Sequence, residues 1–411
     1  MPVNPKSIST ISRNPLDLCN RCGTCLGVCP VYDELRTEPF SPRGKIELAA
    51  RIQSKEFELS HRAAEMVSMC LLCGRCVQAC PAGVHGAHLY TDLRRASLLH
   101  RGMDWRKALL FKIMEHPSLM RGVARFARFG SEMAGGMPSW KSEGRSVSLP
   151  AFSRTFFGEH SPVVTPAIGK RRGRVAYFYG CATHFFFGEV GEATTRALTG
   201  AGMELVIPRE QMCCGMPMIT AGAYDQALHN IRRNVRLFSR LDVDAVIVDC
   251  PTCGSAFKKE IPYLLDHLGL PVEEARILSG KTRDIHEFLS DHPILAPSSS
   301  TKASHRLVVT YHDPCHLAKG QGIQEQPRKL IQSIEGLEFR EMRKADACCG
   351  GGGSFQFDEP QISQSITAKK IASILETEAD LVATPCPSCR MALSNFPANR
   401  HIRVVHPLEL V

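Results

Sequence analysis

The chain has 411 residues, of which 44% are hydrophobic and 22% are charged. This composition is typical of a soluble globular protein, and the length is sufficient for two or three domains. The formal charge of +9 is dispersed and accompanies no motif that reads DNA or RNA, so we expect no nucleic-acid partner. No run of about 18 apolar residues is present, so we expect no transmembrane segment.

The 18 cysteines are the most unusual feature of the composition. A disulfide scaffold is typical of short secreted chains, whereas this chain is long and residues 1–18 lack the apolar core of a secretory signal. We therefore expect a cytoplasmic protein whose thiols are metal ligands. Any contact with the inner face of the membrane is expected to go through partners.

Residues 19–30 and 70–81 share the spacing C-x2-C-x2-C-x3-C-P. This spacing is typical of a pair of [4Fe–4S] clusters in which the fourth cysteine of each run binds the other cluster. We therefore assign one cubane cluster to Cys19, Cys22, Cys25 and Cys80. The second cubane cluster is assigned to Cys29, Cys70, Cys73 and Cys76. Zinc is a weaker alternative, because zinc sites usually combine two C-x2-C pairs.

The sequence between and after these runs predicts helices. In SPRGKIELAARIQ, Ser41 is a candidate N-cap and Pro42 a candidate first helical residue. Residues 104–130 are basic and predicted to be helical, and their apolar stripe contains Leu109, Leu110, Ile113 and Met114. We interpret this stripe as packing in a core, with docking of a partner as the alternative.

A five-cysteine pattern then occurs twice. The first copy contains Cys181, Cys213, Cys214, Cys250 and Cys253. The second copy contains Cys315, Cys348, Cys349, Cys386 and Cys389. Short apolar segments precede these cysteines, at residues 175–179, 204–207, 245–248, 307–311 and 381–383, and helical segments separate them. The alternation predicts parallel sheets with flanking helices, in which the cysteines lie at the carboxyl ends of the strands.

Other polar residues near the repeats have ordinary interpretations. His184, His312 and His316 are expected to be surface or core histidines, with proton donation near a cluster as the alternative. Asp249 and Asp313 are interpreted as capping residues. The glycines after the paired cysteines leave backbone N–H groups free to approach cluster sulfur. They do not form a phosphate loop, because the Lys-Ser/Thr pair of that motif is absent.

The helical setting of the first two runs resembles the α-helical ferredoxin domain of succinate dehydrogenase-like and heterodisulfide reductase-like subunits. The five-cysteine spacing resembles the CCG, or cysteine-rich, domain of heterodisulfide reductases. This resemblance implies that each set of five cysteines can hold a noncubane [4Fe–4S] cluster, so that one or two further clusters accompany the two cubanes. Zinc in the repeats is the alternative.

These resemblances predict an α/β protein with an N-terminal α-helical ferredoxin domain and two duplicated CCG domains with parallel sheets. We expect the ferredoxin domain at residues 1–130 (the N-terminal region) and a linker rich in Gly, Pro and Ser at residues 131–173. CCG domain 1 is expected at residues 174–295 (the first repeat) and CCG domain 2 at residues 296–411 (the second repeat).

The whole layout, the SPRGKI segment and the ending VVHPLELV resemble the iron–sulfur subunit of glycolate oxidase or D-lactate dehydrogenase. The layout also resembles the heterodisulfide reductase subunit that carries CCG domains and, more weakly, a subunit of anaerobic glycerol-3-phosphate dehydrogenase. Glycolate oxidase subunits often lack some cysteines of the first repeat, whereas both repeats are complete here.

The first resemblance implies an electron-transfer subunit of an oxidoreductase complex. In such a complex a FAD-containing partner oxidises glycolate or lactate, and electrons pass through this chain to a membrane or soluble acceptor. The chain itself has no dinucleotide fingerprint and no general-base constellation, so we assign no catalytic residue to it. The alternative is a heterodisulfide reductase-like subunit that reduces a disulfide at a noncubane cluster.

Overall fold

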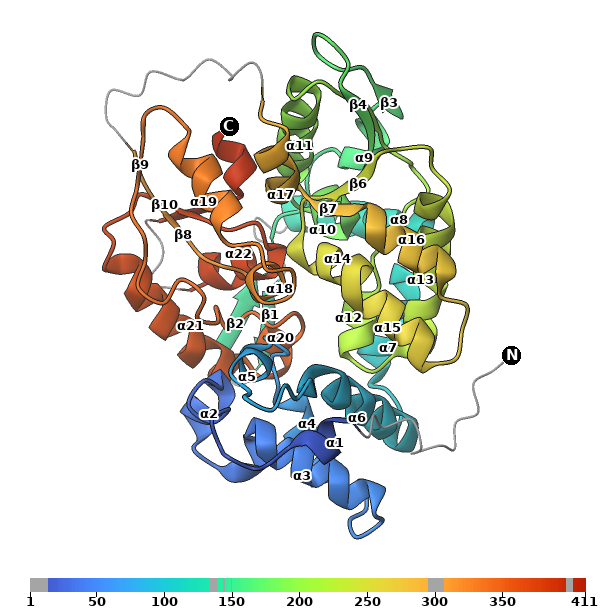
Figure 1. Cartoon of the computed structure of the whole chain (residues 1–411), viewed down its shortest axis with the longest axis vertical. Helices are drawn as coiled ribbons and strands as arrows, with labels where there is room; N and C mark the ends of the chain where they lie inside the picture. Colours follow the sequence, from blue (N-terminus) through green and yellow to red (C-terminus); the bar gives the residue numbers. More distant parts are fainter. Residues whose placement is uncertain (1–13, 134–138, 143–144, 149, 295–306, 397–401) are drawn as a thin grey trace.

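The computed structural model describes residues 14–133, 139–142, 145–148, 150–294, 307–396 and 402–411. The N-terminal region is helical and lies against two α/β repeats that stand side by side (Figure 1, blue below green-yellow and orange-red). None of the helices in these ranges is both long enough and apolar enough to cross a bilayer. The predicted fold class, a helical N-terminal domain with two duplicated parallel-sheet domains, is confirmed.

Short helices carry the cysteine runs of the N-terminal region. They are α1 (Asn14–Leu18), α2 (Pro30–Leu35), the 3-10 helix η2 (Glu38–Phe40), α3 (Pro42–Gln53), α4 (His61–Ser68), α5 (Arg75–Gln78) and α6 (Gly86–Arg101). Helix α3 begins where the sequence predicts, because the Ser41 hydroxyl accepts a hydrogen bond from the Gly44 N–H at 2.9 Å and Pro42 follows the cap.

The basic segment at residues 104–130 differs from the prediction. It forms two helices, α7 (Trp105–Met114) and α8 (Pro117–Met133). Phe111 and Met114 of α7 are buried, but Leu109 and Leu110 are 53% and 51% exposed. The expected core packing of these two leucines was therefore wrong. Helix α7 packs through Phe111 and Met114, which lie three residues apart, and leaves Leu109 and Leu110 largely exposed to solvent.

The first repeat contains a five-stranded sheet of order β3-β5-β4-β6-β7. Its strands are β3 (Val164–Thr165), β4 (Gly173–Phe178), β5 (Met203–Val206), β6 (Ala245–Val248) and β7 (Thr282–Asp284). Strands β4 to β7 pair in parallel, and β3 adds an antiparallel edge from within the segment expected to be a linker. Its helices are α9 (Phe157–His160), α10 (Gly180–Phe185), α11 (Gly188–Gly200), α12 (Met216–Thr220), α13 (Tyr224–Ser239), α14 (Pro251–Ser255), the π-helix η3 (Ala256–Glu260), α15 (Ile261–His267), α16 (Glu273–Lys281) and α17 (Ile285–Asp291).

The second repeat contains a parallel sheet of order β11-β10-β8-β9. Its strands are β8 (Leu307–Tyr311), β9 (Leu337–Phe339), β10 (Leu381–Ala383) and β11 (Arg403–Val405). Its helices are α18 (Cys315–Ala318), α19 (Glu325–Gln332), α20 (Phe355–Asp358), α21 (Pro360–Leu375), α22 (Pro387–Ser394) and the 3-10 helix η5 (Pro407–Leu410). The order of β9, β8, β10 and β11 matches that of β5, β4, β6 and β7, so the duplication inferred from the cysteines extends to the topology. A separate hairpin joins β1 (Ser139–Ser142) to β2 (Arg145–Ser148).

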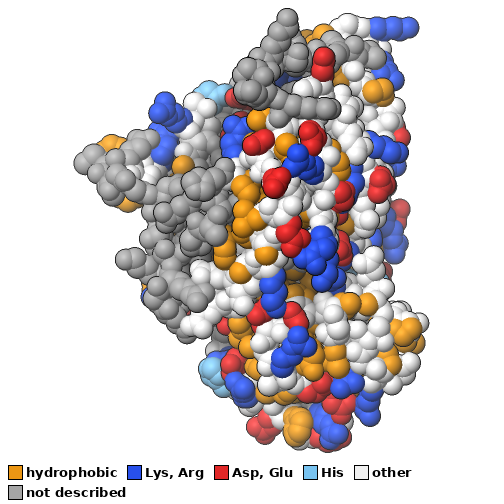
Figure 2. Space-filling view, turned by 90° about the vertical axis from the view of Figure 1, so that its left-hand side faces the viewer, with side chains coloured by type: hydrophobic (Ala, Val, Ile, Leu, Met, Phe, Trp, Pro, Cys, Tyr) orange, Lys and Arg blue, Asp and Glu red, His pale blue; other side chains and the backbone are white. Residues whose placement is uncertain are grey.

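Acidic and basic side chains are interspersed over the described part of the face in Figure 2. Ion pairs at the surface include Arg343 with Glu376 at 2.7 Å and Lys369 with Asp33 at 2.5 Å. The second pair joins α21 to α2 and therefore fastens the N-terminal region to the second repeat. Exposed pairs of this kind stabilise weakly, and their value here is orientation.

Candidate iron–sulfur centres

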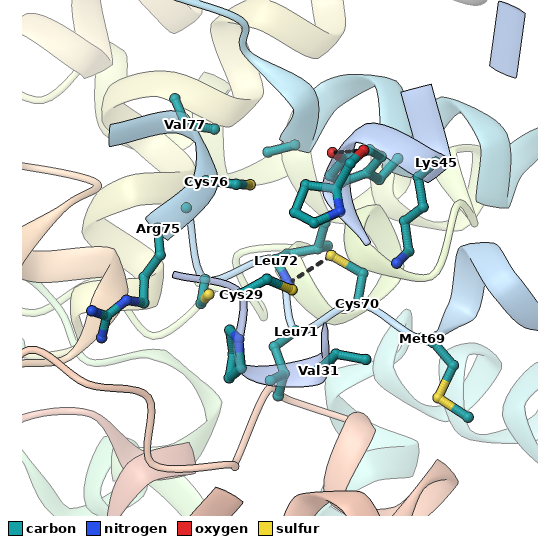
Figure 3. A pocket seen from close by; sticks show the side chains of 16 residues that line it. Cys29, Val31, Lys45, Met69, Cys70, Leu71, Leu72, Arg75, Cys76 and Val77 are labelled. Atoms are coloured by element: carbon teal, nitrogen blue, oxygen red, sulfur yellow. Dashed lines mark hydrogen bonds between the residues drawn. The ribbon is translucent and has the colours of Figure 1, made fainter. Parts of the chain in front are cut away.

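All eighteen cysteines are free thiols, and the fold gathers them into separate sets. One set lies where α2 meets the loop before α5 (Figure 3). There Cys29, from the first run, lines the same pocket as Cys70, Cys73 and Cys76 from the second. Burial raises the pKa of Cys29 to about 11, and the neighbouring Cys70 and Cys73 thiols add to the rise. This placement agrees with the crossed assignment of Cys29.

Cys19, Cys22 and Cys25 form the other N-terminal set. Burial raises the pKa of Cys25, to which the nearby Cys19 and Cys22 contribute. Cys19 and Cys80 pack against the same apolar cluster, and the Cys80 sulfur accepts a hydrogen bond from the Val84 N–H at 3.4 Å. Cys70 and Cys76 pack against this cluster too, so the binding of Cys80 to the first-run cluster stays a prediction.

The segment SPRGKI supports both N-terminal sets. The Arg43 guanidinium donates to the Arg21 carbonyl at 3.2 Å and so fixes the first cysteine loop. Lys45 is 2% exposed, and its ammonium donates to the Phe40 carbonyl. Burial lowers the pKa of Lys45, and the neighbouring Cys70 and Cys29 side chains oppose that shift. A buried lysine beside two cysteines was not predicted, although the unusual segment that contains it was noticed.

The five thiols of the first repeat converge at the carboxyl ends of β4, β5 and β6. Cys181 and Cys213 have their sulfurs 3.9 Å apart. Hydrogen bonds from Cys213 and then Cys253 lower the pKa of Cys214 to about 6, and Cys253 also interacts with Cys250. The chain of contacts therefore includes all five cysteines, as the sequence predicts for strands that end on one side of a sheet.

The five thiols of the second repeat are arranged in the same way. The sulfurs of Cys349 and Cys389 lie 3.1 Å apart. Hydrogen bonds from Cys348 and then Cys389 lower the pKa of Cys349 well below its usual range, and a bond from Cys389 lowers that of Cys386 to about 7. Burial raises the pKa of Cys315, and the neighbouring Cys348 contributes to that rise.

The N-terminal region contacts the second repeat through a cysteine of each. The Cys73 and Cys348 thiols interact, and this interaction is the main cause of the raised pKa of Cys73. Around the two thiols, Leu71 and Phe355 belong to one apolar cluster, and Arg75 lies 3.8 Å from Asp346. The sequence alone gave no sign of this contact, because it joins segments that are far apart in the chain.

The two repeats also meet near their cysteines. Thr252, within the Cys-Pro-Thr-Cys turn of the first repeat, lies 2.9 Å from His316 and 4.0 Å from the Cys386 sulfur. Ser388, at the matching position of the second repeat, instead accepts a hydrogen bond from the Gly353 N–H at 3.2 Å within its own repeat. The matching residues of the two turns therefore make different contacts.

A cavity of about 200 Å³ opens on the thiols of the first repeat. Cys181 and Cys213 line it together with Tyr179, His184 and Arg209, and helices α7 and α8 contribute further lining residues. In the second repeat, the matching cysteines Cys315 and Cys348 lie near Cys73 of the N-terminal region instead. The same side of the two cysteine sets is therefore open in one repeat and covered in the other.

The histidines and aspartates near the repeats are buried. Burial lowers the pKa of His184 to about 4, and its Nδ1 accepts a hydrogen bond from the Gly158 N–H at 3.0 Å. Asp249 accepts hydrogen bonds from the hydroxyls of Tyr177 at 2.7 Å and Thr183 at 2.6 Å. Asp313 pairs with Arg328 at 2.7 Å. These hydrogen bonds and this ion pair indicate that His184, Asp249 and Asp313 support the structure around the cysteines.

The donor sets fit iron–sulfur clusters. Each N-terminal set combines closely spaced thiols in the C-x2-C-x2-C pattern, and each repeat gathers five thiols. Backbone N–H groups also approach sulfur, as Gly350 does with Cys348 at 3.4 Å and Leu72 with Cys70 at 3.4 Å. Such hydrogen bonds are a usual means of tuning cluster potential. Fold and donor sets together define an iron–sulfur protein with a dicluster domain and two cysteine-rich domains.

Comparison with protein families agrees with this class. Residues 15–84 match the 4Fe-4S dicluster domain, and residues 175–258 and 309–394 each match the cysteine-rich domain, CCG. A probable glycolate oxidase iron–sulfur subunit of Bacillus subtilis is 32% identical over 96% of this chain and 92% of its own length. The chain belongs to the glycolate oxidase iron–sulfur subunit family.

Two further relatives have other names. One subunit of the dihydromethanophenazine:CoB–CoM heterodisulfide reductase from Methanosarcina acetivorans is 26% identical over 95% of this chain and 91% of its own length. Lactate utilization protein A from Geobacillus kaustophilus is 31% identical over 58% of this chain and 98% of its own length. The relatives thus belong to oxidoreductase systems with different substrates.

Proposed function

We propose that this chain is the electron-transfer subunit of a flavin-linked 2-hydroxy acid dehydrogenase of the glycolate or lactate type. In this proposal the two N-terminal sets hold cubane [4Fe–4S] clusters and the repeats hold one or two noncubane clusters. The FAD is on a partner subunit. The observation that carries the proposal is the contact between Cys73 and Cys348, because it joins an N-terminal set directly to the cysteines of a repeat.

The residues of the chain support such a role in three ways. Clusters, when bound, accept and release single electrons. The eighteen cysteines would hold them, and the buried Lys45 would favour the reduced state of the cluster beside it. The mostly buried contact between Cys73 and Cys348, surrounded by Leu71 and Phe355, would exclude water from the path between two centres.

Anaerobic purification of the full chain tests this proposal. We expect iron and acid-labile sulfide for at least two clusters, and co-purification with a FAD-containing subunit when the two are expressed together. In a stopped-flow experiment, glycolate or D-lactate should bleach the cluster absorbance only when that flavoprotein is present. Bleaching by either acid without the flavoprotein would contradict the proposal, as would a chain that carries zinc and no iron.

The cavity beside Cys181 and Cys213 favours a second candidate function, reduction of a small disulfide at the first repeat. The cavity would admit a small molecule to the thiol set, and all five cysteines of that repeat are present. The reaction takes two electrons and two protons and releases two thiols. With reduced methyl viologen as the electron donor, bis(2-hydroxyethyl) disulfide should yield two thiols per molecule if this candidate is right. An absence of turnover would leave electron transfer to a protein acceptor as the function.

A further inference from the structure

His312 is a buried imidazole with one unused nitrogen. It follows β8 directly and is 1% exposed. Its Nδ1 lies 3.2 Å from the Ala345 carbonyl, which can only accept, so Nδ1 carries the hydrogen and Nε2 presents a lone pair. Within the described residues Nε2 has no hydrogen-bond partner. Buried polar atoms are rarely left unpaired, so this nitrogen requires an explanation.

Two thiols of the second repeat explain the unpaired Nε2 of His312. One ring nitrogen of His312 and the sulfurs of Cys349 and Cys389 all lie within 4.8 Å of one another. Because Nδ1 is held by Ala345, Nε2 is the nitrogen available to this group. Ligand bonds of about 2.3 Å to sulfur and about 2.0 Å to nitrogen place donors on a single metal ion no more than about 4.6 Å apart. The three atoms are therefore close to the spacing of ligands on one metal.

The backbone holds the imidazole in this orientation. Metal-binding histidines usually donate their second ring N–H to a carbonyl or carboxylate, which fixes the tautomer. Here the Ala345 carbonyl also accepts from the ammonium of Lys370 at 3.1 Å, and Lys370 donates to the Lys344 carbonyl at 2.7 Å. The acceptor is thus anchored independently of His312.

We propose that His312 is a nitrogen ligand, through Nε2, of the metal centre that the cysteines of the second repeat hold. The first repeat has no counterpart, because Phe178 precedes Cys181 by the same three residues that separate His312 from Cys315. The repeats therefore match in their thiols and differ in their donor sets. A neutral imidazole among thiolates raises the reduction potential of an iron–sulfur centre. The centre of the second repeat, which contacts the N-terminal region, then has a higher reduction potential than the centre of the first repeat.

The test uses the full chain, purified anaerobically, with His312→Phe as the main variant. Phe178 shows that this fold accepts a phenyl ring at the matching position. His286→Phe is the matched control. His286 is also 1% exposed, and its Nε2 also has no partner among the described residues, but its Nδ1 bonds with Asp284 at 2.8 Å and it does not belong to the group of His312, Cys349 and Cys389. Metal content is measured during titration with a chelator, and pulsed EPR of the reduced protein, with and without ¹⁵N-histidine labelling, detects coupled imidazole nitrogen. His312→Gln keeps polarity without the ring nitrogen and should behave like His312→Phe.

We expect His312→Phe to release the metal of the second repeat to chelator at least about tenfold more readily and to lose the histidine nitrogen coupling. The control should keep both properties. If His312→Phe retained the coupling, or held its metal as firmly as the control does, His312 would be a packing residue and the proposal would fail. This result is independent of the flavoprotein, so it can be distinguished from a failure of the proposed function.

Discussion

The thiol of Cys73, from the second cysteine run of the N-terminal region, interacts with the thiol of Cys348, the first of the vicinal pair in the second repeat, and this interaction raises the pKa of Cys73. Each belongs to a different candidate centre.

Two adjacent glycines allow a matched test of the contact. Gly352 and Gly353 both have positive φ, at 50° and 64°, so alanine at either position is strained by roughly 1–2 kcal/mol. Only at Gly352 would the added Cβ overlap Leu71, whereas nothing lies within 4 Å of a Cβ at Gly353. We expect Gly352→Ala to be the less stable variant. It should also slow electron transfer from the N-terminal clusters to the second repeat, measured by flash reduction.

Equal rates in Gly352→Ala and Gly353→Ala would show that the position of Leu71 does not control this transfer. Cluster content must be equal in the two variants for the comparison to hold.

The crossed arrangement of the N-terminal sets predicts which signal each fourth cysteine affects. Cys29 lies among Cys70, Cys73 and Cys76, so Cys29→Ser should alter the EPR signal of the cluster held by those three. Cys80→Ser should alter the other signal. The two clusters are distinguished by their reduction potentials. If Cys29→Ser altered the signal of the cluster held by the first run, and Cys80→Ser that of the cluster held by the second run, the runs would not be crossed.

The buried ammonium of Lys45 is expected to affect the reduction potential of the cluster beside it. Its ammonium is buried near Cys29 and Cys70, where charges interact more strongly than in water. Removing a positive charge makes addition of an electron less favourable, so Lys45→Met should lower the reduction potential of that cluster. Arg51→Met, which removes a cation from an exposed position on the same helix, should leave it almost unchanged in an EPR redox titration. A similar shift in both variants would exclude a local effect.

The raised pKa of Asp249 predicts that the stability of the fold depends on pH. Burial raises its pKa to about 6, although hydrogen bonds from Thr183 and Tyr177 oppose the rise. Because an unfolded aspartate has a pKa of about 3.9, the folded state binds this proton more tightly and stability falls as pH rises from about 4 to about 6. Infrared difference spectra between pH 5 and 7.5 should show a protonated carboxyl that titrates near pH 6 and is missing in Asp249→Asn. Identical spectra for the two proteins would contradict the assignment.

Local signals in the sequence were sufficient for much of the fold. Ser41 and Pro42 mark the start of α3 because capping depends on neighbouring residues only. The strands before Cys181, Cys250, Cys315 and Cys386 are short apolar runs that end a few residues before each cysteine. Their pattern therefore also gives the side of the sheet on which the thiols gather.

Features that depend on tertiary packing were not predictable. Leu109 looks like a core residue in the sequence but is exposed, because α7 packs through a different face. The free nitrogen of His312 depends on the position of the Ala345 carbonyl, more than 30 residues further along the chain. Strand β3 reads as linker because its two residues gain strand structure only by pairing with β5. In each case the deciding partner is distant in sequence.

Arg94 joins the N-terminal region to the first repeat. Its guanidinium donates to the Thr220 carbonyl of the first repeat at 2.7 Å and to the Cys70 carbonyl, in a cysteine loop of the N-terminal region, at 2.6 Å. Tyr224 adds a hydrogen bond to Asp92 at 2.9 Å, while Lys369 of the second repeat holds the opposite side through Asp33. A cluster domain fastened on both sides cannot act as a swinging carrier that shuttles between donor and acceptor. Internal transfer should therefore proceed at a rate that does not depend on solvent viscosity.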